Sequence, residues 1–247
     1  MKMRKKPICV YCRVLPGVED EHVFPDSWYP ATTPTTVQRL TVPSCKPCNR
    51  KWKALEERIG PDMQMICSRE VYGAVGVNAK QSRSWSVQHA RDTEDARHRA
   101  GKALKILHTM AWPNAHPGAP VAQVRIGARA RLASPARVIQ PADLHALAEK
   151  FVRGLYYFET DGLTLPEIII KAKIIPNALV RVVTPLKQDW ARVINTFRQL
   201  PIATQLSPGL EYRRFFGAHD FQGWDFLLWG QFEIFAMSQP LILRAAR

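Results

Sequence analysis

Residues 9–12 read CVYC and residues 45–49 read CKPCN, which places two Cys-x-x-Cys pairs near the N-terminus. Cysteine pairs at this spacing are typical of structural zinc sites, in which four thiolates close a tetrahedral cage around one ion. The segment between the pairs has to fold back so that both pairs reach the same ion. The predicted ligands of this structural zinc ion are Cys9, Cys12, Cys45 and Cys48.

The segment between the two pairs contains Glu21 and His22, and Asn49 follows the last cysteine directly. An imidazole titrates near neutral pH and therefore suits a general base, whereas carboxylate and amide oxygens suit Mg²⁺ or Mn²⁺. Adjacent residues of a regular strand point to opposite faces, so Glu21 and His22 share a site only if the strand bends or bulges near Glu21. If it does not, Glu21 is not a ligand.

These cysteines and Asn49, together with residues 21–25 (EHVFP), resemble the HNH endonuclease family over residues 7–60. The resemblance implies a ββα-metal module with a four-cysteine zinc knuckle. It also implies that His22 is the general base and that Glu21 and Asn49 bind a catalytic Mg²⁺ or Mn²⁺. Many members carry an asparagine shortly before the second cysteine pair, but residues 37–42 read VQRLTV here. The group that orients His22 is therefore open.

The resemblance implies an enzyme, an endonuclease that hydrolyses phosphodiester bonds in DNA, with His22 activating water and the cation stabilising the leaving oxygen. A non-catalytic zinc-knuckle protein that only binds nucleic acid remains open, with His22 incidental. An RNA-directed nuclease also remains open, because nothing in the hairpin distinguishes the two sugars. Restriction, phage defence, mobile elements and repair all use such modules.

The stretch 49–60 predicts a helix, with Trp52, Leu55 and Ile59 on one buried stripe and Gly60 at its end. Its other faces carry basic residues that either contact phosphates or form an ordinary solvated surface. They include Arg50, Lys51 and Lys53. A second basic segment, residues 121–140, contains no acid and is either a nucleic-acid-binding arm or a loop. Its candidate contact residues are Arg125, Arg129 and Arg131.

The composition agrees with a polyanionic partner. The formal net charge is +14 and the sequence pI is near 9.9, which favours nucleic acid, and we expect DNA. No apolar run is long enough to cross a membrane, and the basic N-terminus lacks the apolar stretch of a secretory signal. We therefore expect a cytoplasmic protein, in which reduced thiols favour zinc over disulfides.

The predicted fold class is α+β, with the zinc-stapled ββα module followed by a mixed α/β region that ends in an antiparallel sheet. We divide the chain into the module (1–60), a basic helical and linker region (61–140) and an α/β C-terminal domain of unknown role (141–247). The last is a candidate surface for a homodimer or a partner subunit.

Periodic apolar patterns predict the elements beyond the module. Helices are expected from Thr93 to about residue 111, from Pro141 to about residue 161, and over 188–200. Strands are expected at 168–175, 178–183, 212–216, 224–229 and 232–237. The aromatic side chains of Trp224, Trp229 and Phe235 either stack on unpaired bases or pack in the core, and their apolar neighbours favour the core.

Overall fold

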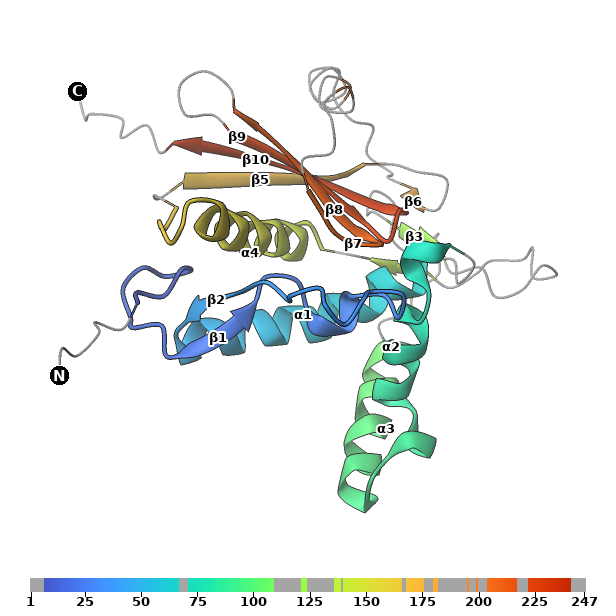
Figure 1. The fold of residues 1–247 in the computed structure, drawn as a ribbon. Helices are drawn as coiled ribbons and strands as arrows, with labels where there is room; N and C mark the ends of the chain where they lie inside the picture. The colour runs from blue at the N-terminus through green and yellow to red at the C-terminus, as the bar shows by residue number, and fades with distance from the viewer. Residues whose placement is uncertain are drawn as a thin grey trace, which may run out of the picture.

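The structure is a computed structural model, in which the short N-terminal strand β1 (Glu19–His22) pairs antiparallel with β2 (Thr41–Ser44). Helix α1 (Lys46–Ile66) follows β2 directly and packs against this hairpin (Figure 1). The pairing is regular from Glu19 opposite Ser44 to His22 opposite Thr41. The residues that the structure describes are 7–66, 71–108, 121–123, 136–138, 140–165, 168–175, 180–181, 195, 199, 204–216 and 222–240.

The C-terminal part forms a five-stranded antiparallel sheet with the order β5-β10-β9-β8-β7. Its strands are β5 (Ile168–Ile175), β7 (Thr204–Ser207), β8 (Leu210–Phe216), β9 (Gln222–Leu228) and β10 (Phe232–Pro240). The mixed α+β class with antiparallel sheets is therefore confirmed.

The middle of the chain forms helices α2 (Val77–Trp85) and α3 (Thr93–His108), which project away from the sheet (Figure 1). Three single-turn helices connect the larger elements, at Asp26–Trp28, Tyr72–Ala74 and Val87–His89. A small antiparallel sheet has the order β4-β3-β6. Its strands are β3 (Val121–Gln123), β4 (Ala136–Val138) and β6 (Val180–Arg181).

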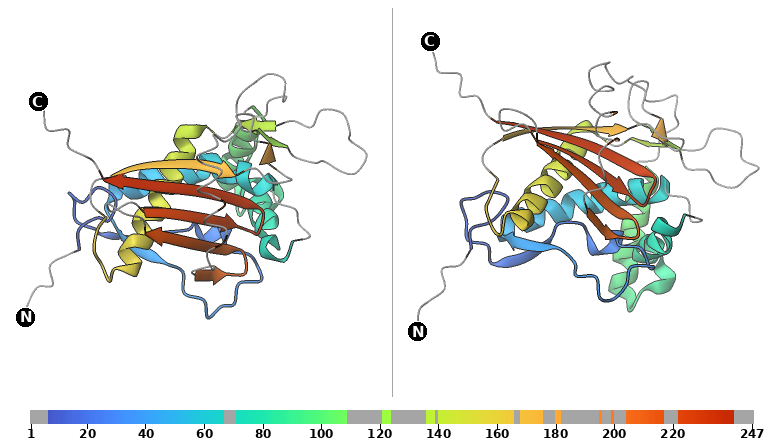
Figure 2. Two further views of the ribbon diagram at one scale, coloured as in Figure 1. Left: turned by 90° about the horizontal axis from the view of Figure 1, so that it is seen from above. Right: turned by 45° about the horizontal axis from the view of Figure 1, so that its top comes forward.

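Helix α4 (Pro141–Glu159) lies between the sheet and the N-terminal hairpin and helix (Figure 1; Figure 2 shows the same layers from two other sides). Its middle residue Phe151 contacts both layers. The Phe151 ring lies 4.5 Å from the ring of Phe24 and 5.4 Å from that of Phe226, measured between centroids. One hydrophobic core therefore runs from the N-terminal module through α4 to the sheet.

A second link joins the module to the sheet directly. The rings of Trp28 and Trp229 lie 5.3 Å apart, and the indole nitrogen of Trp229 donates a 2.7 Å hydrogen bond to the carbonyl of Trp28. Trp229 follows β9, more than two hundred residues from Trp28 along the chain. This contact orders the loop after β1 against the C-terminal sheet.

The helix predicted from residue 141 is confirmed together with its inward face. The six apolar residues of its predicted stripe are all buried, namely Leu144, Leu147, Ala148, Phe151, Val152 and Leu155. The aromatic side chains of Trp224, Trp229 and Phe235 are also fully buried, which confirms core packing rather than base stacking. His145 lies beside the stripe, and its Nε2 is 3.0 Å from the carbonyl oxygen of Ala172.

The predicted end of the first helix at Gly60 is wrong. Helix α1 continues through Gly60 and Pro61 to Ile66, so the boundary placed after residue 60 falls inside a helix. Gly60 is buried against Trp28, and a Cβ at this position would lie 3.4 Å from the indole nitrogen. The glycine therefore allows α1 to pack closely against Trp28, and it does not end the helix.

Two predicted elements lie largely or wholly outside the described residues. Of the strand expected at 178–183, only Val180–Arg181 is described. Of the helix expected over 188–200, only residues 195 and 199 are described, and the basic side chains Arg125, Arg129 and Arg131 lie beyond the described part of the chain.

Because Phe151 joins the two layers, we predict that Phe151→Ala lowers the free energy of unfolding by about 3–5 kcal/mol, as for other buried aromatic truncations. The matched control is Phe158→Ala on the same helix, where the side chain is 51% exposed. This control should change the unfolding free energy by no more than about 0.5 kcal/mol. Urea denaturation followed by tryptophan fluorescence measures both values, and equal effects would contradict the layered core.

Candidate functional site

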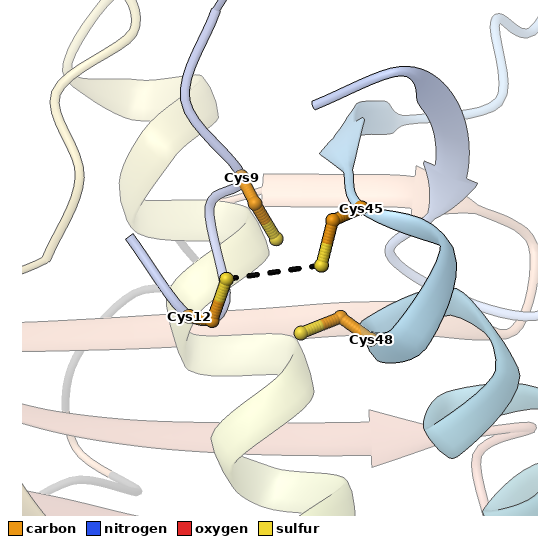
Figure 3. Close-up of side chains that lie close together, drawn as sticks. All are labelled: Cys9, Cys12, Cys45 and Cys48. Atoms are coloured by element: carbon orange, nitrogen blue, oxygen red, sulfur yellow. Dashed lines mark hydrogen bonds between the residues drawn. The ribbon is translucent and has the colours of Figure 1, made fainter. Parts of the chain in front are cut away.

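The four cysteines of the two pairs converge at one end of the hairpin (Figure 3). Cys9 and Cys12 lie on a tight turn, in which the amide of Arg13 donates to the carbonyl of Cys9 at 2.9 Å. Cys45 follows β2, and Cys48 lies in the first turn of α1. The cluster therefore ties the N-terminal turn to the junction between β2 and α1.

The geometry of the cluster fits zinc. All four sulfur atoms lie within 4.8 Å of one another, and those of Cys12 and Cys45 are 3.7 Å apart. A tetrahedral zinc ion with Zn–S bonds near 2.3 Å requires sulfur–sulfur separations of about 3.8 Å. Four cysteines this close, with no disulfide among them, can bind a metal ion such as zinc.

The thiols in the cluster differ in acidity. Burial acts to raise the pKa of Cys12, but backbone hydrogen bonds at Leu15 and Val14 and the neighbouring thiols outweigh it and lower the pKa to about 7. Burial, together with Cys45 and Cys9, strongly raises the pKa of Cys48. Four adjacent sulfurs cannot all ionise unless a cation neutralises them, so metal binding has to release protons.

Asn49 lies against β1. Its side-chain amide nitrogen donates a 2.7 Å hydrogen bond to the carboxylate of Glu19, two residues before Glu21. Side chains two residues apart on a strand share a face and lie roughly 7 Å apart along it. The structure therefore brings Asn49 to the face of β1 that also carries Glu21.

Glu21 is buried and paired with a lysine. Lys150 of α4, which is fully buried, donates a 2.6 Å hydrogen bond to Glu21 and also pairs with Glu56 of α1. Burial raises the pKa of Glu56, although Lys150 acts in the opposite direction. As arranged here, Glu21 does not fit as a ligand of a divalent cation, because its carboxylate is bound to Lys150. Asn49 binds Glu19 through its amide nitrogen, whereas the amide oxygen is the atom that a cation would use.

His22 is the last residue of β1. The regular pairing through Glu21 means that the bend or bulge expected there is absent, and the chain bends after His22, at Val23 and Phe24. Strand alternation assigns Glu21 to the buried face with Val42 and His22 to the face of the exposed Thr41. The Nδ1 atom of His22 is buried and has no hydrogen-bond partner within the described part of the chain. No orienting group is therefore found for its imidazole there.

The predicted basic residues of α1 are exposed. Arg50, Lys51 and Lys53 all lie on the solvent side of the helix, and the Lys51 ammonium sits 4.3 Å from the centre of the Trp52 ring. Trp52 itself is buried, as its place in the apolar stripe predicts. These three residues are exposed and do not belong to the buried face of the helix.

Lys150 and Glu56 were not predicted from the sequence. A usable signal for Lys150 exists, since it stands between Ala148 and Phe151, both of which belong to the predicted buried stripe. A lysine at such a position needs a buried partner, because an unpaired buried charge is strongly unfavourable. The sequence does not indicate which acid is the partner.

Comparisons with protein-family models, curated proteins and solved structures found no match to this chain. The resemblance to the HNH endonucleases therefore rests on the residues of the N-terminal segment alone. Within the described residues, no helix combines the length and apolar character that a membrane span requires.

We predict that Cys45→Ser removes bound zinc and unfolds the N-terminal module, because metal binding contributes directly to the folding energy of such sites. Elemental analysis should find one zinc per wild-type chain and none in the variant, and the thermal unfolding midpoint should fall. Lys46→Ala, at the exposed neighbouring position, is the control and should keep its zinc. A Cys45→Ser chain with unchanged stability and no zinc would refute the structural role.

Proposed function

We propose that the chain is a metal-dependent HNH-type endonuclease that hydrolyses phosphodiester bonds in DNA. The observation that supports this most is the hydrogen bond between Asn49 and Glu19 beside the cysteine cluster. It brings Asn49 against the face of β1 that carries Glu21, and His22, which lies on the opposite face, has to turn toward them for the three residues of the motif to share one site. The order β1, β2, α1 is the one that the resemblance implies.

The proposed chemistry assigns His22 the removal of a proton from the attacking water, which a neutral imidazole can do near pH 7. A divalent cation, when bound, supplies stabilisation of the charge that develops on the leaving oxygen. Glu21 and Asn49 are the proposed ligands. Glu21 becomes available to a cation beside His22 only when it releases Lys150 and β1 bends to bring the two side chains to one face, so this step depends on both changes.

The exposed cations of α1 are proposed to hold the phosphates that flank the scissile bond. Arg50, Lys51 and Lys53 lie in the same helix as Asn49, within its first two turns. Charges on one face of a helix neutralise backbone phosphates without reading the base sequence. In this proposal α1 provides affinity for the DNA backbone, and the hairpin carries the residues that hydrolyse the phosphodiester bond.

A second candidate is a zinc-stapled protein that binds nucleic acid without cleaving it. The pairing of Glu21 with Lys150 favours this alternative, because it leaves Glu21 no free charge for a cation. The Nδ1 of His22, which has no partner among the described residues, also favours it, since a general base is normally held in place by a second group. Binding would then use the same α1 cations.

We predict that His22→Ala lowers the rate of plasmid nicking by about 10²–10⁴-fold, the usual contribution of a general base. Supercoiled plasmid is incubated with the protein and MgCl₂ or MnCl₂, with and without chelator, and single-stranded RNA is tested in parallel. Zinc content and thermal stability should stay unchanged, because His22 lies outside the cysteine cluster. The control His98→Ala, on the exposed surface of α3, should cut like the wild type.

The same assay separates the two candidates. A wild-type chain that binds DNA but leaves plasmid and RNA intact with either cation supports the non-catalytic binder and refutes the nuclease. Cleavage that survives His22→Ala at the wild-type rate would also refute the assigned base.

Removing α1 charge should weaken binding in a salt-dependent way. We predict that Arg50→Ala and Lys53→Ala each reduce the slope of log affinity against log salt by about 1, because each releases one counterion fewer. Fluorescence anisotropy with a labelled DNA duplex, titrated at several NaCl concentrations, gives the slopes. Arg97→Ala, an exposed residue of α3, is the charge-matched control and should leave the slope unchanged. If the wild type and all variants gave equal slopes, α1 would not be the binding surface.

A further inference from the structure

A cavity of about 610 Å³, the α2 cleft, is lined by residues of α2 and of the single-turn helices on either side of it. Its polar lining consists of Asn78, Ser82, Arg83 and His89, and the remaining lining residues are alanine and glycine. Pockets of about 300–1,000 Å³ hold small organic ligands, so the α2 cleft is large enough for more than a single ion.

The local path of the chain brings the polar side chains of the cleft together. Ser82 and Arg83 lie near the end of α2, where the amide of Ser86 donates a 3.0 Å hydrogen bond to the carbonyl of Ser82. The amide of His89 then donates to the carbonyl of Ser86 at 3.1 Å. These two turns fold the chain back on itself, so the imidazole of His89 lines the same cleft as the guanidinium of Arg83.

Helix α2 is held in place by contacts on two sides. The Lys80 ammonium donates a 2.8 Å hydrogen bond to the carbonyl of Tyr29, in the loop after β1. On the other side, Arg99 of α3 donates to the carbonyl of Arg83 and pairs with Asp95 at 3.0 Å. The side chains on α2 therefore project from a helix that is fixed before any ligand arrives, which lowers the cost of binding.

The cleft is lined by cationic and neutral groups. Among the described residues, no carboxylate lines it, and Arg83 forms no ion pair with an acid. The Arg83 Nε donates to the carbonyl of Ala79 at 3.3 Å, which directs the stem of the side chain along α2. Lys80 lies three residues before Arg83, so both charges lie on the same side of the helix. This lining suits an anion.

A phosphate group matches the donors of the cleft. The planar guanidinium of Arg83 can donate two parallel hydrogen bonds to a phosphate, and His89 and Ser82 can each donate another. Because the cavity is larger than a phosphate alone, a sugar and a base can occupy the remaining volume. We propose that the α2 cleft binds a nucleotide through its phosphate group. A free nucleotide and a nucleotide within a strand present the same phosphate chemistry.

This binding site goes beyond the proposed nuclease. The cleft lies outside the hairpin and α1, and binding there requires neither His22 nor a metal ion. It can therefore be measured whether or not the protein cleaves nucleic acid.

Fluorescence anisotropy with two probes tests the site, namely a ribose-labelled ATP and an end-labelled single-stranded oligonucleotide, both at one salt concentration. We expect R83A to raise the dissociation constant of the bound probe by at least about tenfold, the usual cost of losing hydrogen bonds to a charged group. H89A should weaken binding of the same probe. R97A removes an exposed charge of α3 outside the lining and should change binding by less than about twofold.

The choice of probe identifies the source of the phosphate. Weaker binding of ATP by R83A and H89A assigns the cleft to free nucleotides, and weaker binding of the oligonucleotide alone assigns it to a strand. Both results support the proposal. A wild-type chain that binds neither probe overturns it, and so do variants that bind both probes as tightly as the wild type. Equal weakening by R83A and R97A also overturns it, because only the general positive charge would then matter.

Plasmid nicking by the same samples separates this inference from the proposed function. If the wild type leaves plasmid intact but binds a probe through Arg83, the phosphate site stands and the nuclease fails. If the wild type nicks plasmid and R83A binds both probes like the wild type, the nuclease stands and the inference fails.

Discussion

Convergence of four thiols from two distant turns is the constraint on which the N-terminal architecture depends. The β1–β2 hairpin pairs over only four residues on each strand, and so short a ribbon is not stable alone. A metal ion at the cluster would close the chain between Cys12 and Cys45 and hold the hairpin to the first turn of α1. With these elements held together, Asn49 meets β1 at Glu19.

Helix α4 turns this small module into part of a larger core. Phe151 contacts aromatic rings of both neighbouring layers, and one position away Lys150 pairs with acids of β1 and α1. The apolar and the ionic contact thus come from adjacent residues of the same helix. The module and the C-terminal sheet are therefore coupled through α4, both by packing and by charge.

Local patterns made the cysteine cluster and α4 predictable. Metal-ligand spacing and a helical apolar stripe are both contained in short stretches of sequence. The partners of Lys150 were not predictable, because they lie 129 and 94 residues away along the chain. The end of α1 was misplaced because burial of Gly60 against Trp28 overrides a local helix-ending signal. The face of β1 that carries His22 was also not predictable, because it depends on the register in which β1 pairs with β2.

X-ray absorption at the zinc edge of the purified wild-type protein tests the central claim most directly. The cluster predicts four sulfur ligands at about 2.3 Å and no nitrogen or oxygen in the first shell. A mixed sulfur and nitrogen shell, or a folded protein that carries no zinc, would contradict the account.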